Sequence, residues 1–213
     1  MREGEMLAPS LATTRILRAY AGVRPLVAAD NDPSGRSISR GIVCLDHETR
    51  DGLAGFITIT GGKWTSYRKM AEDTVDKAIK MGKVEKRKCV TRKLKVHGWR
   101  PNPNLADHMY VYGADEPAIL DMIKQNPALG EKLSEKYDYT VAEVLWAIRH
   151  EMALTVDDVL ARRVRLLFVD AREAQKAAPR VAQILAEELG RDQAWIDEQV
   201  ASFVELASHY YVA

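Results

Sequence analysis

Residues 56–68 read Phe-Ile-Thr-Ile-Thr-Gly-Gly-Lys-Trp-Thr-Ser-Tyr-Arg, and the organisation of the first half of the chain follows from this stretch. Its β-branched residues alternate up to Thr60, which predicts a strand with Ile57 and Ile59 on one face. Beyond the glycines, apolar residues recur three or four positions apart: Tyr67, Ala71, Val75, Ala78 and Ile79. The stretch therefore predicts a strand, a glycine turn and an amphipathic helix packed on a sheet.

The predicted turn carries a lysine directly after two glycines. Gly61 and Gly62 tolerate positive φ and let the backbone approach a ligand closely. The unpaired amides at the start of the following helix favour an anion, and Lys63 adds a full positive charge. A tight turn with a solvated lysine is the plainer interpretation, because the segment is neither a P-loop nor a dinucleotide fingerprint. These residues alone leave both interpretations open.

The composition is that of an ordinary soluble globular protein. The 213 residues are 46% apolar and 29% charged, and they can form one large domain or two small ones. A net charge of +1 argues against a dedicated nucleic-acid binder. Short apolar runs and the lack of a signal-peptide pattern predict a cytoplasmic protein without a membrane span. Cys44 and Cys89 are expected to be reduced thiols, and the spacing of the histidines predicts no metal site.

Two more strands are predicted upstream of the central stretch. Residues 21–27 and 38–45 show the required pattern, and turn formers at 47–52 direct the second strand back toward Phe56 as an antiparallel partner. Arg40 lies in an otherwise apolar row of that second strand. Because burying an arginine without an anionic partner is costly, this row indicates an anion beside Arg40.

The composition changes after the predicted helix. Residues 80–95 are rich in Lys and Arg, but their charges alternate with Val84, Cys89, Val90 and Leu94. This alternation indicates a solvated linker or an edge strand rather than an anion-binding tract. The prolines and asparagines of residues 99–104 then mark the best domain boundary in the chain.

The second half carries the signals of helix starts. Thr140 and Glu143 form a capping box, and Thr155 with Asp158 opens a further helix. Pro179 is expected to kink or divide a long helical pattern. We therefore predict an α+β fold that is predominantly α. A small mixed α/β lobe over residues 13–95 is followed by an all-helical domain over residues 104–213.

The helical half shows no catalytic constellation. Three arginines close together in it are interpreted as structural: Arg162, Arg163 and Arg165. At least one of them is expected to reach the carboxylate of Asp157 or Asp158.

Several segments, in order, resemble the C-terminal part of FAD-dependent glycerol-3-phosphate dehydrogenases. They are residues 21–26, 38–40 and 61–72 in the first half, and 158–171, 179–181 and 186–190 in the second. The resemblance covers nearly the whole chain after about residue 13. No Gly-x-Gly-x-x-Gly follows a predicted strand, so the family's FAD-binding Rossmann unit is missing. The chain thus resembles a C-terminal fragment, which is expected to be inactive and to hold no FAD by itself.

The resemblance implies an enzymatic role for the full-length protein. There, FAD takes a hydride from C2 of sn-glycerol 3-phosphate, dihydroxyacetone phosphate forms, and the electrons pass to a quinone. Arg24 and Arg40 are the expected phosphate ligands, because the guanidinium fork matches phosphate oxygens. Lys63 is the expected catalytic residue, close to the substrate hydroxyl or to the flavin, and it also contributes to substrate binding.

The turn is also the expected flavin contact within this chain. By resemblance, the cofactor-binding residues are Gly62, Lys63, Trp64 and Thr65. The amides of the last three would face the flavin's C2 carbonyl and N1, where negative charge collects on reduction.

Each assignment has an alternative. Arg24 and Arg40 can instead form structural salt bridges with Asp30, Asp32 or Asp46. A related oxidase would pass the electrons to oxygen. In a different class of function, the helical half would be a docking module for a partner subunit or for a membrane surface, and peripheral attachment to the inner membrane remains open for the full-length protein.

Overall fold

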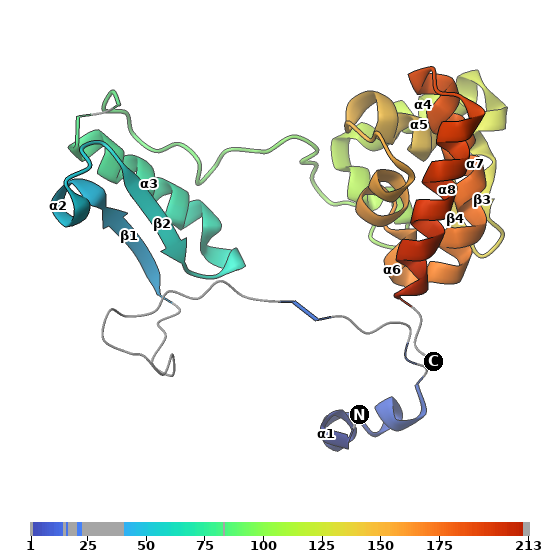
Figure 1. The fold of residues 1–213 in the computed structure, drawn as a ribbon, viewed down its shortest axis with the longest axis horizontal. Helices are drawn as coiled ribbons and strands as arrows, with labels where there is room; N and C mark the ends of the chain where they lie inside the picture. Colours follow the sequence, from blue (N-terminus) through green and yellow to red (C-terminus); the bar gives the residue numbers. More distant parts are fainter. Residues whose placement is uncertain (1, 15, 17–20, 23–40, 83, 211–213) are drawn as a thin grey trace. The chain divides into compact units, whose positions relative to one another are not determined.

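The computed structural model describes residues 2–14, 16, 21–22, 41–82 and 84–210. The chain divides into a smaller unit, Gly22–Val96, and a larger unit that contains Met1–Ala21 and His97–Ala213 (Figure 1). Residues 23–27 of the predicted first strand and residues 38–40 of the predicted second strand lie outside the described residues. In the N-terminal segment, the structure has the short helix α1 (Arg2–Leu7) and the 3-10 helix η1 (Pro9–Thr13).

The smaller unit is built on an antiparallel strand pair. Strand β1 (Ile42–Asp46) pairs with β2 (Ile57–Gly61), and Cys44 lies opposite Ile59. This confirms the predicted antiparallel pairing. The connection is the short helix α2 (His47–Asp51), whose first turn is capped by the Asp46 side chain.

Helix α3 (Tyr67–Lys80) follows β2 through the 3-10 turn η2 (Trp64–Ser66), as the central stretch predicts. The predicted apolar stripe, however, is not the face that packs. Tyr67 and Val75 are 64% and 54% exposed, whereas Lys77 Nζ donates to the Cys44 carbonyl at 3.0 Å. The described two-stranded sheet offers too little surface to cover the whole apolar face of a helix, so much of that face stays open.

The larger unit is predominantly α, which confirms the predicted fold class. Its elements are η3 (His108–Asp115), α4 (Glu116–Gln125), η4 (Pro127–Gly130), β3 (Lys132–Ser134), β4 (Tyr137–Thr140), α5 (Val141–His150), η5 (Asp158–Arg163), α6 (Leu166–Val169), α7 (Ala171–Leu189) and α8 (Gln193–Ser208). The helix η5 has π geometry. The helical pattern did not predict the short hairpin of β3 and β4.

The β3–β4 hairpin is held against α7 by polar contacts. Ser134 Oγ donates to Glu173 at 2.7 Å, and Lys136 Nζ lies 3.0 Å from the same carboxylate. Lys176, Ser134 and Lys136 together lower the pKa of Glu173 to about 2. Tyr137 and Tyr139 of β4 have ring centroids 6.3 Å apart. The hairpin is therefore fixed by contacts with residues distant in sequence, and a local pattern does not reveal them.

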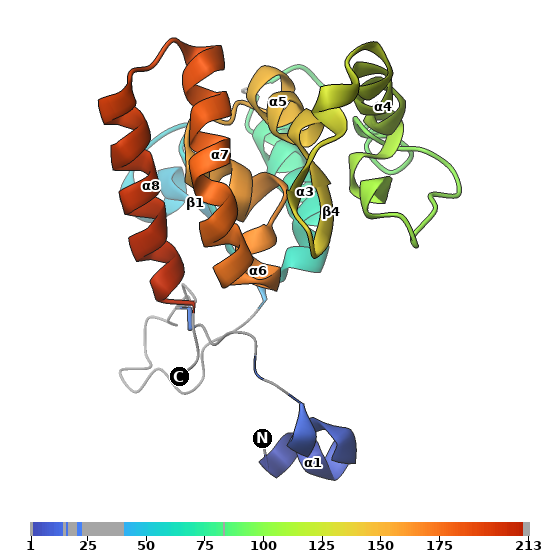
Figure 2. The ribbon, with the colours of Figure 1, turned by 90° about the vertical axis from the view of Figure 1, so that its right-hand side faces the viewer.

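Helices α7 and α8 lie side by side and contribute much of the core (Figures 1 and 2). Helix α7 continues through Pro179, so the proline does not divide it as the sequence pattern allowed. Its buried side is rich in small residues, all at most 2% exposed: Ala174, Ala177, Ala178 and Ala182. Gly190, at φ 64°, ends α7 and lets the chain turn into α8. None of the helices in the described ranges is long and apolar enough to cross a membrane.

The packing of α4 in the core of the larger unit can be tested by substitution. Ile119 in α4 is fully buried, whereas its neighbour Leu120 is 39% exposed. We expect Ile119→Ala to lower the free energy of unfolding by roughly 2–5 kcal/mol, because it removes apolar contacts and leaves a cavity. The matched control Leu120→Ala should change it by about 0.5 kcal/mol or less. Urea unfolding followed by circular dichroism measures both, and equal losses would contradict the observed orientation of α4.

Candidate functional site

The candidate site is the turn between β2 and α3. Gly61 and Gly62 have φ values of 75° and 74°, in the region that favours glycine. A Cβ on Gly61 would lie 2.2 Å from the Gly41 carbonyl oxygen, and one on Gly62 would lie 2.6 Å from Met70 Sδ. The Gly62 amide donates to the Gly41 carbonyl at 3.2 Å. Conformation therefore favours glycine at both positions, and at Gly61 the nearby backbone oxygen also leaves no space for a side chain.

Lys63 is held by its backbone and extends an exposed side chain. Its amide donates to Ser66 Oγ at 3.1 Å, and the Ser66 hydroxyl donates back to the Lys63 carbonyl at 2.8 Å. Among the described residues, no ion pair of the Lys63 ammonium is found. The turn thus presents a positive charge on a rigid backbone.

The backbone amides of Lys63, Trp64 and Thr65 are not equally free to bind a ligand. Because the Lys63 amide is already bonded to Ser66, it is not free in the structure, unlike in the sequence-based interpretation. Trp64 and Thr65 are the first residues of the helical turn, and their amides have no carbonyl one turn earlier within the helix. These two N–H groups can donate hydrogen bonds to an anion or to a carbonyl oxygen.

An aromatic pair extends this site along α3. Trp64 is 87% exposed, Tyr67 is 64% exposed, and their ring centroids are 5.8 Å apart. Large aromatic side chains seldom stay this exposed without a partner, so this surface is suited to contact with a cofactor or with further protein.

The two predicted phosphate ligands, Arg24 and Arg40, lie outside the described residues. So do Asp30 and Asp32, their candidate structural partners. The remaining candidate, Asp46, caps α2 and lies 4.0 Å from Lys77 Nζ. The structure therefore describes Lys63, Gly62, Trp64 and Thr65 together in one turn, and both arginines remain predictions.

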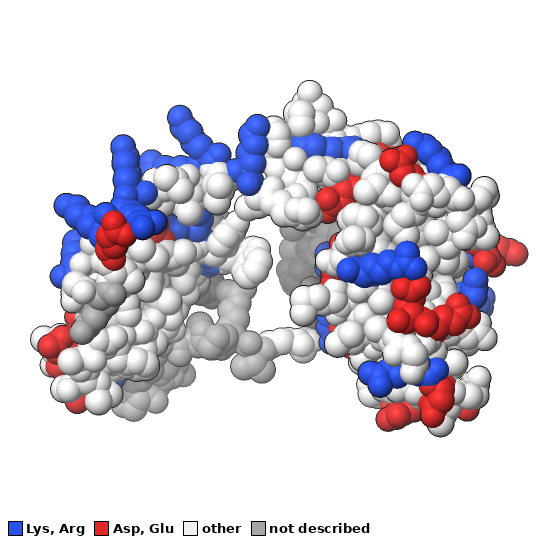
Figure 3. All heavy atoms as spheres, turned by 90° about the horizontal axis from the view of Figure 1, so that it is seen from above, with Lys and Arg blue, Asp and Glu red and all other residues white. Residues whose placement is uncertain are grey.

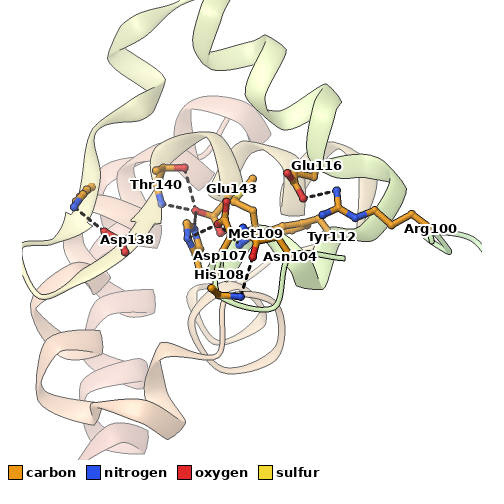
Figure 4. Close-up of polar contacts among 12 residues, drawn as sticks. Arg100, Asn104, Asp107, His108, Met109, Tyr112, Glu116, Asp138, Thr140 and Glu143 are labelled. Atoms are coloured by element: carbon orange, nitrogen blue, oxygen red, sulfur yellow. Dashed lines mark hydrogen bonds and ion pairs between the residues drawn. The ribbon is translucent and has the colours of Figure 1, made fainter. Parts of the chain in front are cut away.

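A second polar cluster in the larger unit centres on the buried carboxylate of Glu143, which is 1% exposed (Figure 4). The Thr140 amide donates to it at 2.7 Å, as the predicted capping box requires. Tyr112 Oη donates at 3.0 Å, and His108 Nε2 lies 3.2 Å away. The sequence analysis identified the cap but missed His108 and Tyr112, because they are more than 30 positions from Glu143 and no local pattern links them.

The Glu143 carboxylate shifts the ionisation of its neighbours. Its hydrogen bond raises the pKa of His108, and the negative charges of Glu143, Asp107 and Asp138 act in the same direction. Burial and the nearby Glu143 also raise the pKa of Tyr112 well above its usual range, so the phenol stays protonated. The cluster joins η3 to the start of α5. Because both oxygens of the Glu143 carboxylate already accept hydrogen bonds from the protein, the cluster has a structural role.

Two of the three arginines near η5 form ion pairs, which confirms the prediction that at least one of them reaches Asp157 or Asp158. Arg162 pairs with Asp157, and Arg163 lies 3.6 Å from Asp158. Arg163 also donates to the backbone carbonyl of Glu151.

The described residues also bear on two other functional classes, a metal site and a docking module. In the part of the chain that the structure describes, no group of three or more potential metal ligands comes together. Between residues 155 and 210, the large apolar side chains that are exposed are Val169 and Val204, at 39% and 40%. This range therefore offers little apolar surface for docking, whereas earlier in the helical half Leu105, Val111, Met152 and Leu154 are 58–81% exposed.

The comparisons with known proteins show which family the chain resembles. Residues 56–196 match the family model described as the C-terminal domain of alpha-glycerophosphate oxidase. One subunit of the anaerobic glycerol-3-phosphate dehydrogenase of Escherichia coli (strain K12) is 40% identical over 219 residues, covering 96% of this chain and 39% of that protein. The corresponding protein of Haemophilus influenzae is 68% identical over 91 residues, covering 42% of this chain and 16% of that protein. A mitochondrial glycerol-3-phosphate dehydrogenase of Arabidopsis thaliana is 36% identical over 208 residues, covering 82% of this chain and 32% of that protein.

The matched domain assigns the chain to the class of alpha-glycerophosphate oxidase-like proteins. The relatives narrow this class, and the chain belongs to the FAD-dependent glycerol-3-phosphate dehydrogenase family, to whose C-terminal part it corresponds. This confirms the resemblance found in the sequence. The chain spans less than half the length of the relatives it matches.

The glycine turn can be tested with a matched pair of substitutions. Gly82 has φ 69° but open space around a built Cβ, whereas Gly61 has both positive φ and a backbone oxygen in the way. We expect Gly82→Ala to cost roughly 1–2 kcal/mol for the left-handed conformation alone, and Gly61→Ala to cost more. Hydrogen exchange of the β1 and β2 amides measures the difference, and equal protection in the two variants would contradict the tight approach to Gly41.

The Glu143 cluster predicts a pH dependence of stability. Because the folded-state pKa of His108 is raised, its contribution is complete below the unfolded pKa of about 6.5 and is lost as pH rises through the folded value. Between about pH 5.5 and about pH 8.5, the unmodified chain should therefore lose unfolding free energy that His108→Gln does not lose. His97→Gln, at a residue whose side chain is 86% exposed, is the control and should keep the original dependence. Parallel urea-unfolding profiles for the unmodified chain and His108→Gln would refute the assignment.

Proposed function

We propose that this chain is the C-terminal portion of an FAD-dependent sn-glycerol-3-phosphate dehydrogenase. The full-length enzyme would oxidise glycerol 3-phosphate to dihydroxyacetone phosphate. The observation that carries the proposal is a Gly-Gly-Lys turn at a helix start, within a chain whose named relatives are glycerol-3-phosphate dehydrogenases. The described chain by itself would be inactive, because the FAD pyrophosphate site would belong to another part of the full-length protein.

The proposed electron acceptor is a quinone. A second candidate is oxygen, because the matched family model carries the name of an oxidase. Production of hydrogen peroxide, measured against reduction of a soluble quinone, distinguishes the two acceptors. The proposed location is cytoplasmic and peripheral to the inner membrane, where a quinone is accessible.

The proposed domain organisation assigns residues 13–95 to the end of the substrate- and FAD-binding domain. Residues 104–213 would form the helical C-terminal domain. The open apolar side of α3, with Trp64 and Tyr67 exposed, supports an incomplete first domain whose remaining surface is covered by another part of the full-length protein.

The substrate phosphate would be bound by Arg24 and Arg40. A phosphate dianion requires several positive donors, and two guanidinium forks with the Lys63 ammonium supply three charges without a metal. Lys63 would act near the substrate hydroxyl or the flavin. Its rigid backbone, fixed by Ser66, limits the positions that the ammonium can reach and so favours a defined distance to the reacting carbon.

The turn fits the electron-rich edge of a flavin. FAD, when bound, would supply the hydride acceptor for C2 of the substrate. The free amides of Trp64 and Thr65 would donate to a carbonyl or ring nitrogen that gains negative charge, which eases reduction. Gly62, at φ 74°, would let the backbone pass close to the ring.

The test uses the full reading frame, expressed and purified with its flavin. Oxidation of glycerol 3-phosphate, followed with a phenazine dye, should be present, and its absence in a flavin-loaded preparation would overturn the proposal.

Substitutions in that full-length enzyme then separate the roles of the three cations. Arg24→Ala and Arg40→Ala should each remove charge-assisted bonds worth roughly 1.5–3 kcal/mol and so raise KM. Lys63→Ala should lower kcat more than it raises KM. Arg→Lys replacements should rescue little, because the fork geometry is lost while the charge remains.

Inhibition by inorganic phosphate or by glycerol 2-phosphate provides the control. These anions should bind weakly to the two arginine variants and nearly normally to Lys63→Ala if Lys63 acts on the hydroxyl. Should both arginine variants bind the anions as tightly as the unmodified enzyme, the arginines are structural.

A further inference from the structure

The segment of residues 80–96 has a charge unlike that of the rest of the chain. It contains eight basic side chains and one acidic side chain, whereas the whole chain carries a net charge of +1. The sequence pattern indicated a solvated linker or an edge strand rather than an anion-binding tract. The described part of the segment is an exposed linker, as the first of these alternatives predicts, but it also leaves aliphatic side chains exposed among its cations.

The described residues of this basic segment form neither helix nor strand beyond Lys80, the last residue of α3. Its apolar side chains are strongly exposed: Val84 50%, Val90 71%, Leu94 62% and Val96 70%. The segment is attached to α3 where Arg68 donates to Thr91 Oγ1 at 3.1 Å. A turn closed by the Lys93 amide and the Val90 carbonyl, 3.4 Å apart, then directs cations and apolar side chains outward together.

Three lysines of the basic segment are exposed cations. Lys86, Lys88 and Lys93 are exposed, and no ion pair of theirs is found among the described residues. Arg87 pairs with Glu85, the one acidic residue of the segment, and both side chains stay more than 70% exposed. Figure 3 shows Lys and Arg side chains projecting from the unit that contains β1, β2 and α3, with few acidic side chains between them on that face.

We propose that the basic segment docks onto an anionic lipid bilayer. Its lysines and arginines would lie among the negative headgroups, and the exposed Val90 and Leu94 would enter the boundary with the acyl chains. Such a mixture of cations and aliphatic residues, without regular structure, suits a fluid charged surface. The inference rests on the proposed function in one respect, since a quinone acceptor dissolved in the membrane requires the enzyme to approach the bilayer.

Two other polyanionic partners fit the segment less well. Residues 81–96 contain no Phe, Tyr or Trp on which nucleic-acid bases could stack. A specific interface with an acidic protein would also be expected to bury aromatic anchors in pockets, and small aliphatic side chains between lysines provide none.

The test is binding of the 213-residue chain to lipid vesicles, without substrate or flavin. Vesicles of phosphatidylcholine with roughly one quarter phosphatidylglycerol should bind the chain in co-sedimentation, and pure phosphatidylcholine vesicles should not. Raising NaCl from about 0.05 M to about 0.5 M should release most of the protein. The triple variant Lys86→Gln, Lys88→Gln, Lys93→Gln should bind roughly 100-fold more weakly.

A second triple variant with the same charge change is the control. Lys124→Gln, Lys132→Gln and Arg191→Gln alter exposed cations of the larger unit and should leave vesicle binding within about twofold of the unmodified chain. Val90→Ser with Leu94→Ser should weaken binding while the charge is unchanged. Equal binding to neutral and anionic vesicles, or equal losses in the two triple variants, would overturn the proposal. Since no turnover is measured, this result does not depend on whether the enzymatic proposal succeeds.

Discussion

The larger unit depends on a carboxylate that cannot be solvated. Glu143 is 1% exposed, and a buried carboxylate is tolerable only if donors surround it. Thr140 supplies two of them from the adjacent helix start, while His108 and Tyr112 supply the others from η3. One side chain therefore both caps α5 and fixes a segment more than 30 residues earlier in the chain, so removing a single donor affects both elements.

The features that the sequence predicted well are local. The strand, glycine turn and helix of residues 56–80 were readable because alternation, positive-φ glycines and helical spacing each act within a few residues. The antiparallel pairing with β1 followed from the turn formers between them. At the candidate site, Gly62, Lys63, Trp64 and Thr65 are contiguous, so their proximity is a property of the backbone.

The features that were missed depend on distant partners. Apolar spacing identified α3 as amphipathic, but whether Tyr67 and Val75 are buried depends on what the sheet can cover. The β3–β4 hairpin is held by Glu173, almost 40 residues after Ser134. In the same way, the sequence around His108 and Tyr112 contains no pattern that predicts their contacts with Glu143. The Lys63 amide was also predicted incorrectly. It donates its hydrogen bond to the side chain of Ser66, three residues later, and not to a ligand.

The alanine side of α7 has a consequence for how this region can vary among related proteins. Helices that meet through alanine are held by the close approach of their backbones, so dispersion contacts are made with little side-chain volume. At Ala178 and Ala182, which are fully buried, there is no spare volume for a longer side chain. Substitutions that add atoms there would overpack the core. We therefore expect the outer face of α7 to tolerate larger side chains and the inner face to require small ones.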